Sequence, residues 1–150
     1  MTIYFDMDGT IADLYNVENW LPRLRKSDPT PYTEAKPMLR FSTLARLINQ
    51  LQRKGVRFGI ISWTSKGGSA TYNQQVSEAK RRWLRKHLPS VRFDEMHIVC
   101  YNYPKELFKN KYDILFDDCE SIRKDWGDGA YTPENILKVL GILTELAEWA

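Results

Sequence analysis

The chain has 150 residues, of which 43% are hydrophobic and 27% charged, and its formal net charge is +3. This composition is typical of a globular protein with one core, and the charge is too low for a dedicated nucleic-acid-binding protein. No segment approaches the roughly 20 apolar residues that a membrane span requires, so we expect no membrane association.

The N-terminal segment and the cysteines bear on the cellular location of the protein. The N-terminus runs directly into a strand-like segment without the features of a secretory signal. Cys100 and Cys119 form neither a CxxC pair nor a disulfide framework, which favours a reducing compartment. We therefore expect a cytoplasmic protein with a single domain over residues 1–150, and we leave its oligomeric state open.

The first third of the chain opens with a strand and continues into an irregular insertion. Residues 2–5 are strand-like and lead into the acidic segment 6–10. Residues 13–37 contain four prolines and mixed charges. A helix is predicted over about 17–25, and the rest reads as loop. Because the insertion directly follows the acidic segment, we interpret it as a small lid, or minimal cap.

Helices and strands then alternate to the end of the chain. The predicted helices cover about 44–51, ending at Gly55, about 76–84, ended by Pro89, and 133–149. The predicted strands are residues 56–61, 97–100 and 113–116. The last helix is expected to bury Ile136, Leu137, Leu140, Leu143 and Leu146. This alternation predicts an α/β fold, with a parallel central sheet between two helical layers.

Two groups of side chains have more than one interpretation. Residues 80–86 include five basic side chains around Trp83 and Leu84. We expect the two apolar residues to be buried and the basic ones to form a solvated helix face, with nucleic-acid contact possible but not favoured. Tyr15, Trp20 and Tyr32 of the insertion either pack together or stack on a base, and packing is favoured.

Polar side chains follow three of the predicted strands. Asp6 and Asp8 follow the first, Ser62 the second, and the pair Asp117-Asp118 the last. Ligands of open parallel sheets bind at the carboxyl ends of the strands, so we expect these groups to share one pocket. Clustered carboxylates repel one another unless a cation neutralises them. Their hard oxygen atoms indicate Mg²⁺, bound together with a phosphate group.

Two carboxylates two residues apart can divide the chemistry of phosphate transfer. One attacks phosphorus and becomes an aspartyl-phosphate, while the other protonates the leaving oxygen and later activates water. Gly9 permits a tight turn that exposes backbone N–H groups, and Thr10 and Ser62 can donate hydrogen bonds to phosphoryl oxygens. A lysine would complete the charge stabilisation.

Four segments of the chain resemble the ordered motifs of the haloacid dehalogenase (HAD) superfamily. They are DMDGT at residues 6–10, GIIS ending at Ser62, Pro104-Lys105, and ILFDD at residues 114–118. The resemblance implies a HAD-like, Rossmann-like fold and a Mg²⁺-dependent hydrolase that forms an aspartyl-phosphate.

The resemblance also implies roles for individual residues. Asp6 would be the nucleophile and a metal ligand, and Asp8 the general acid/base that offers its backbone carbonyl to the metal. Asp117 and Asp118 would hold the metal, one of them directly. The phosphate-binding residues would be Thr10, Ser62 and Lys105. For the last position Lys109 and Lys111 are competitors, and Lys105 is preferred because Pro104 precedes it and a turn fits between it and Asp117.

The aspartate at position 8 narrows the resemblance to phosphatases and phosphomutases, because dehalogenases lack it. The layout is most similar to 5′-nucleotidase-like members and to small bacterial or phage relatives. We therefore expect a small phosphorylated substrate, such as a nucleoside monophosphate. Two alternatives are a phosphatase acting on nucleic-acid ends, which the short insertion would admit, and a non-catalytic domain that binds a phosphorylated ligand.

Overall fold

A five-stranded sheet forms the centre of the computed structural model, which describes residues 1–149. Every neighbouring pair of strands is parallel, and β1 lies in the middle, with Phe5 aligned with Ile60 on one side and Phe116 on the other. In spatial order the strands are β5 (Glu95–Val99), β4 (Arg57–Trp63), β1 (Thr2–Phe5), β6 (Ile114–Phe116) and β7 (Ala130–Tyr131). Four of them correspond to predicted strands, and β7 was not predicted.

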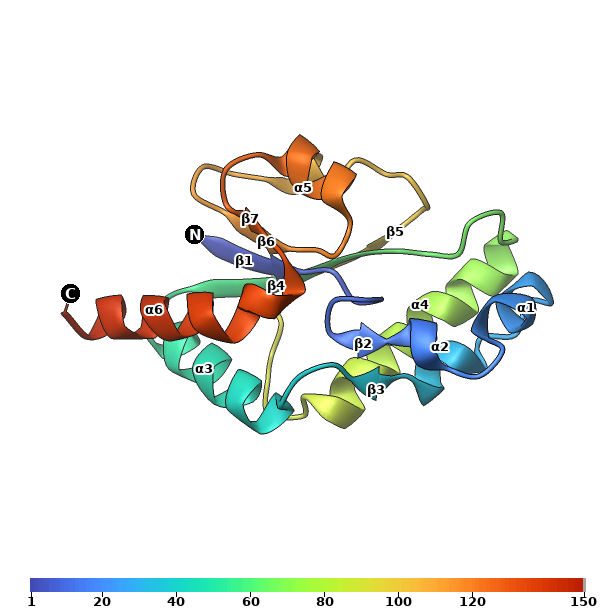
Figure 1. Cartoon of the computed structure of the whole chain (residues 1–150), viewed down its shortest axis with the longest axis horizontal. Coiled ribbons are helices and arrows are strands. Elements are labelled where there is room, and N and C mark those ends of the chain that lie inside the picture. The colour runs from blue at the N-terminus through green and yellow to red at the C-terminus, as the bar shows by residue number, and fades with distance from the viewer. Residues whose placement is uncertain (150) are drawn as a thin grey trace.

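Helices cover both faces of this sheet (Figure 1). One face packs against α3 (Phe41–Arg53), α4 (Ala70–His87) and α6 (Ile136–Trp149). The other face packs against α5 (Glu120–Trp126) and the 3₁₀ helix η2 (Lys105–Phe108). The α/β fold with a parallel sheet between two helical layers is therefore confirmed.

The side chains of the central strand alternate between these two layers. Ile3 and Phe5 belong to the larger core beneath α3, α4 and α6, whereas Tyr4 belongs to the smaller core beneath α5. All three are at most 1% exposed. Since successive side chains of a strand point to opposite faces, a strand covered on both sides must be apolar throughout.

The insertion contains more regular structure than its sequence predicts. Its ends pair as a short antiparallel hairpin of β2 (Ala12–Asp13) and β3 (Lys36–Pro37). Between them lie the 3₁₀ helix η1 (Leu14–Asn16) and two short helices, α1 (Trp20–Arg25) and α2 (Thr30–Glu34). The prediction of a loop was wrong for α2, because Pro31 lies in its first turn, where a missing N–H group is tolerated.

Helix α4 corrects one prediction about the basic run at 80–86. It is longer than predicted, and the hydroxyl of Ser69 accepts a hydrogen bond from the backbone N–H of Tyr72 at its start. Trp83 and Leu84 are buried, and the other four basic residues of the run are exposed, as expected. Lys80, however, is only 1% exposed, so it does not belong to the solvated face.

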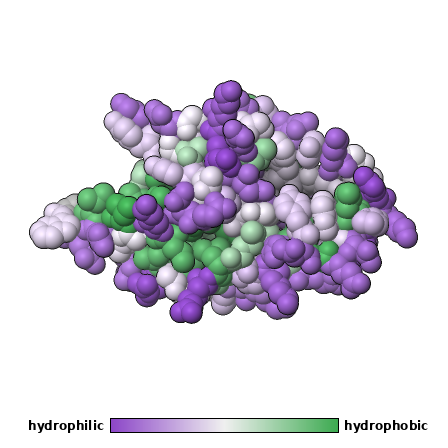
Figure 2. Space-filling model, in the orientation of Figure 1, coloured by the Kyte–Doolittle hydropathy of each residue, from purple (hydrophilic) through white to green (hydrophobic). Residues whose placement is uncertain are grey.

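Helix α6 follows a short 3₁₀ turn, η3 (Pro133–Asn135), and buries only part of the predicted stripe. Ile136 and Leu140 are fully buried, but Leu146 is 61% exposed. The second half of the helix extends past the rest of the molecule, so less of it is covered (Figure 1). Figure 2 shows hydrophobic residues gathered along this helix. None of the helices within residues 1–149 combines the length and the apolar character of a membrane span.

Candidate active site

The carboxyl ends of β1, β4 and β6 bring the predicted polar residues to one edge of the sheet. Asp6 directly follows β1 and Asp117 directly follows β6, while Ser62 is the penultimate residue of β4. The backbone N–H of Asp6 donates to the carbonyl of Phe116 at 2.9 Å, which joins the two strand ends at this point. The strand order reverses beside β1, which is where ligands bind in sheets of this kind.

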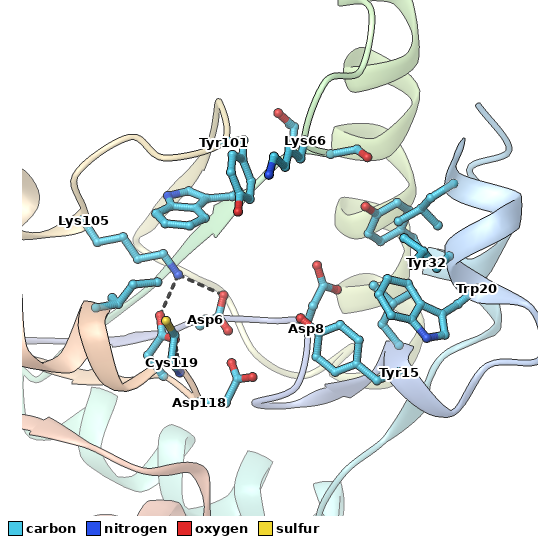
Figure 3. Close-up of a pocket in the computed structure, with 18 of the residues that line it drawn as sticks. Asp6, Asp8, Tyr15, Trp20, Tyr32, Lys66, Tyr101, Lys105, Asp118 and Cys119 are labelled. Carbon is cyan, nitrogen blue, oxygen red and sulfur yellow. Dashed lines mark hydrogen bonds and ion pairs between the residues drawn. The ribbon is translucent and has the colours of Figure 1, made fainter. Parts of the chain in front are cut away.

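A buried lysine at the start of η2 links the carboxyl ends of β1 and β6. The Nζ of Lys105 lies 2.9 Å from Oδ1 of Asp6 and 2.7 Å from Oδ2 of Asp117, and the lysine is only 2% exposed (Figure 3). Burial alone would lower the pKa of Lys105, but the two carboxylates raise it above its ordinary value. Burial likewise opposes ionisation of Asp6, but the charge of Lys105, hydrogen bonds with Asp118 and Lys105, and the charge of Lys80 together outweigh it, so the pKa of Asp6 is lowered. The site therefore holds Asp6 as a carboxylate, the form that acts as a nucleophile.

The two competing lysines lie elsewhere. Lys109 donates to the backbone carbonyls of Trp126 and Asp128 at 2.9 and 2.8 Å, at the far end of η2. Lys111 is exposed and lies over the ring of Tyr112. The structure thus places Lys105, and neither of the other two, beside Asp6.

Thr10 contacts the carboxylates of the site directly. Its hydroxyl oxygen lies 2.9 Å from Oδ2 of Asp6 and 3.2 Å from Oδ1 of Asp118, so its one hydrogen can be donated to either carboxylate, and it accepts from the backbone N–H of Asp118 at 3.2 Å. The threonine is 1% exposed. These bonds fix Asp6 relative to Asp118, and a direct contact between Thr10 and phosphate stays a prediction.

Gly9 makes the turn after β1 in a conformation that other residues rarely adopt. Its φ is +78°, in the left-handed region. A β-carbon at this position would overlap the carboxylate of Asp118 and approach the ring of Tyr15 to 2.7 Å. Glycine is therefore required both by the backbone and by the close approach of Asp118.

Three carboxylates form a group that fits a divalent cation. Asp6, Asp117 and Asp118 each offer an oxygen, and these oxygens lie within 4.8 Å of one another. Burial, together with the charge of Asp6, raises the pKa of Asp117 to about 6 and that of Asp118 to about 7. Hard oxygen donors whose mutual repulsion is relieved by a cation suit Mg²⁺. The side chain of Asp8 is not part of this group.

Asp8 instead pairs with Lys80, whose place in a basic run predicts exposure to solvent. The Nζ of Lys80 lies 2.8 Å from Oδ2 of Asp8 and 2.7 Å from Oγ of Ser62. Burial raises the pKa of Asp8 above its ordinary value, although Lys80 counteracts this. The position of Lys80 four residues after Val76, and next to Ala79, places it on the buried face of α4, and this spacing could have identified it.

The site lines a cavity of about 470 Å³, which lies within the usual size of small-molecule pockets. Figure 3 shows Asp6 and Lys105 on one side of this cavity, with Tyr15, Trp20 and Tyr32 of the insertion on the opposite side. Trp63, at the end of β4, also lines it, and its indole N–H donates to the carbonyl of Tyr103 at 2.8 Å. Aromatic side chains therefore border the cavity both on the insertion and on the sheet.

The three aromatic residues of the insertion differ in their surroundings. Tyr32 is buried in a cluster with Tyr72 and Val76 of α4, which agrees with the packing interpretation. Tyr15 is 49% exposed and meets Trp20 edge-on, with ring centres 5.0 Å apart. Both line the cavity, so both interpretations are compatible with their positions.

The insertion is attached to α4 along its length. Tyr72 donates from its hydroxyl to the carbonyl of Asp28 at 2.9 Å, and Trp83 donates from its indole to the carbonyl of Ala35 at 2.7 Å. Leu14 and Tyr32 pack against the same helix. The wall of the cavity is thus anchored on a helix that also carries Lys80.

No protein-family model matches the sequence, and no curated protein is detectably similar to it. The fold is similar to the crystal structure of D,D-heptose 1,7-bisphosphate phosphatase from Burkholderia thailandensis, with a TM-score of 0.58. The similarity covers 95% of this chain and 97% of that chain at 10% sequence identity. It shows that the two proteins share an α/β fold with a mostly parallel central sheet flanked by helices.

Proposed function

We propose that this chain is a Mg²⁺-dependent phosphatase that hydrolyses phosphomonoesters through an aspartyl-phosphate on Asp6. The observation that carries the proposal is the position of Asp6, whose two carboxylate oxygens are held by Lys105 and Thr10 at the floor of the cavity. Two further observations support it. The carboxylates of Asp117 and Asp118 lie beside Asp6, and the protein with a similar fold is a phosphatase.

The residues of the chain can carry both halves of the reaction. A carboxylate oxygen of Asp6 forms a bond to phosphorus, the bond from phosphorus to the ester oxygen breaks, and Asp8 supplies the proton that this oxygen takes up. In the second half Asp8 takes a proton from water, the water oxygen bonds to phosphorus, and the bond to Asp6 breaks. The products are the alcohol and phosphate, and both aspartates return to their starting states.

Lys105, Ser62 and the acidic residues have supporting roles in this proposal. Lys105 stabilises the charge on Asp6 and on the transferring phosphoryl group, and Ser62 donates a hydrogen bond to a phosphoryl oxygen. Asp6, Asp117 and Asp118 would hold Mg²⁺ together with the backbone carbonyl of Asp8. A bound Mg²⁺ ion neutralises charge on the phosphoryl oxygens.

The cavity favours a small phosphoester with a planar group, such as a nucleoside monophosphate. Trp63 and Tyr101 lie on the sheet side with ring centres 5.1 Å apart, and Tyr15 lies on the insertion side. A base can stack on such side chains without further recognition. We propose that residues 13–37 act as an anchored lid that forms the second wall.

The first experiment compares hydrolysis of p-nitrophenyl phosphate with and without Mg²⁺ for the wild type and Asp6→Asn. We expect hydrolysis that depends on Mg²⁺ in the wild type and its loss in the variant. Asp125→Asn, an exposed aspartate on α5, is the matched control and should retain activity. Hydrolysis by Asp6→Asn at the wild-type rate would refute the assignment of Asp6 as the nucleophile. A wild type that is inactive on a broad panel of phosphate esters would refute the proposal that the chain is an enzyme.

A panel of nucleoside monophosphates, sugar phosphates and 5′-phosphorylated oligonucleotides identifies the substrate class. We expect the highest kcat/KM for a nucleoside monophosphate. The second candidate is a phosphorylated nucleic-acid end, since exposed Arg25 and Lys66 also line the cavity. Activity on oligonucleotides without activity on monophosphates would establish that candidate instead.

A further inference from the structure

Lys80 is a buried lysine whose hydrogen-bonding capacity is fully used. An ammonium group has three N–H donors and no acceptor. Its three partners are Oδ2 of Asp8 at 2.8 Å, Oγ of Ser62 at 2.7 Å and the carbonyl of Trp63 at 2.7 Å. Because no donor is left over, Lys80 cannot bind a substrate without giving up one of these contacts.

The insertion contributes to the burial of this lysine. Nζ of Lys80 lies 5.1 Å from the ring centre of Tyr32, which belongs to α2. Tyr32 is 5% exposed and packs with Tyr72, Val76 and Ala79, which precede Lys80 on α4. A cation in such a position requires a compensating anion, and Asp8 is the one carboxylate that pairs with it among residues 1–149.

The contacts of Lys80 use only part of the hydrogen-bonding capacity of Asp8 and Ser62. At Asp8 the lysine occupies Oδ2, and within residues 1–149 Oδ1 accepts no side-chain hydrogen bond. At Ser62 the oxygen accepts from the lysine, and a hydroxyl has only one hydrogen to donate. Among the described residues this hydrogen has no acceptor. One oxygen of Asp8 and the hydroxyl hydrogen of Ser62 are thus left for other partners.

We propose that Lys80 is a positioning residue of the reaction, which holds Asp8 and Ser62 so that Oδ1 of Asp8 faces the ester oxygen and the Ser62 hydroxyl faces a phosphoryl oxygen. This role rests on the proposed function. Lys105 binds the nucleophile from η2, and Lys80 binds the acid/base residue from α4, so two buried lysines orient the two aspartates of the acidic segment separately.

The test exploits the fact that p-nitrophenolate leaves without a proton, whereas an alkoxide requires one. Lys80→Met should lower kcat/KM for an alkyl phosphate such as glycerol 2-phosphate about 10- to 100-fold, a part of what general acid catalysis supplies. This ratio is the one to compare, because it reports only the half of the reaction in which the leaving oxygen is protonated. For p-nitrophenyl phosphate the loss of kcat/KM should be several times smaller. Equal losses of kcat/KM on both substrates would overturn the proposal, because Lys80 would then not act through Asp8 as the acid.

A double-mutant cycle with Asp8→Asn gives an independent result. If Lys80 acts through Asp8, adding Lys80→Met to Asp8→Asn should cost less than about threefold further on the alkyl phosphate. Losses that multiply would show that the two residues act separately. Binding of orthophosphate, measured by calorimetry, is a readout other than turnover. It should weaken only about two- to tenfold in Lys80→Met, as expected for one less well-oriented hydrogen bond from Ser62.

The controls separate this proposal from loss of folding and from failure of the proposed function. Lys86→Met removes an exposed lysine of the same helix and should leave kcat unchanged. Lys80→Gln keeps an N–H donor and is the second variant if Lys80→Met does not give a native circular dichroism spectrum. An inactive wild type would refute the proposed function, whereas an active wild type with fully active, folded Lys80 variants would refute only the role of Lys80.

Discussion

The indole ring of Trp63 lies across Lys105, with Nζ of the lysine 5.3 Å from the centre of the ring. Lys105 in turn binds Asp6 at 2.9 Å, so the aromatic wall of the cavity begins directly beside the proposed nucleophile. The indole is fixed by its hydrogen bond to the carbonyl of Tyr103. A planar group attached to a phosphate on Asp6 would therefore meet a rigid aromatic surface.

Replacement of Trp63 tests whether this surface binds the substrate. Trp63→Leu should raise KM for the preferred nucleoside monophosphate about 5- to 100-fold, the cost of losing one stacked base. KM for glycerol 2-phosphate should change little, because that substrate has no planar group. Trp63→Phe should retain most of the affinity. An equal rise of KM for both substrates would mean that Trp63 acts only by packing on Lys105.

Removal of Lys105 should impair both turnover and folding. Lys105→Met should lower kcat at least 100-fold, because the lysine is the cation nearest Asp6, the proposed nucleophile. It also leaves two buried carboxylates without the cation that pairs with them, so the metal-free protein should lose about 3–5 kcal/mol in urea unfolding at pH 7. Lys111→Met, at an exposed position, should change neither quantity. An active Lys105→Met enzyme would return Lys109 and Lys111 to consideration.

The acidic group predicts how stability depends on pH without Mg²⁺. The pKa values of Asp117 and Asp118 in the folded protein, about 6 and 7, lie above the ordinary value of about 3.9. The folded state therefore keeps protons that the unfolded state loses, and these groups reduce stability as pH rises from about 4 to 7. We expect the Tm of the metal-free protein to fall between pH 5 and 8, and Asp118→Asn to reduce this fall. A fall of the Tm that is as steep in Asp118→Asn as in the wild type would contradict the assignment.

Mg²⁺ should reverse the effect, since it binds the ionised carboxylates. At a concentration 100 times its Kd, Mg²⁺ should raise the Tm at pH 8 by about 5–10 °C, and by clearly less at pH 5. Thermal unfolding with and without the ion measures this difference. The same shift at both pH values would argue that the ion binds elsewhere.

Removal of the hydrogen bond between Tyr72 and Asp28 tests how firmly the insertion is attached. Tyr72→Phe should cost about 0.5–1.5 kcal/mol in urea unfolding, the usual contribution of one such bond. Amide hydrogen exchange should become faster in α1 and α2 and stay unchanged in the sheet. Tyr112→Phe, an exposed tyrosine, is the control. Unchanged exchange in the insertion would show that its apolar contacts with α4 are sufficient.

The sequence predicted the residues that sit at strand ends and missed those that depend on tertiary packing. Asp6, Ser62 and Asp117 could be placed because a parallel sheet gathers the carboxyl ends of its strands. Lys80 was not predicted, because it lies in a basic run whose charge predicts a solvated face, while its helical spacing predicts burial. Its side chain is buried only because Asp8 compensates it, and a contact across 72 residues leaves no local signal.

The insertion illustrates the same limit. Its prolines predicted a loop, yet α2 forms there, because Tyr32 is buried against α4 and tertiary packing outweighs the local preference. The short strand β7 likewise depends on its neighbour, since Leu115 donates to the carbonyl of Gly129 at 3.0 Å. Two residues are too few for a periodic pattern to identify.

Gly9→Ala should separate the requirements of the active site from those of the backbone. A positive φ alone makes alanine unfavourable by about 1 kcal/mol. At position 9 the new β-carbon would also displace Asp118 or Tyr15, so the site itself must change. We expect a loss of at least tenfold in kcat and a weaker affinity for Mg²⁺, measured by calorimetry.

Gly55→Ala is the matched control for this change. Gly55 has a φ of +90° after α3, and a β-carbon there would meet no other atom within 4 Å. It should lose only the roughly 1 kcal/mol that the positive φ costs, with unchanged kcat and Mg²⁺ affinity. If Gly9→Ala behaved in the same way as Gly55→Ala, the close approach of Asp118 to the turn would not matter for the reaction. The proposal that the turn fixes Asp118 as a metal ligand would then be wrong.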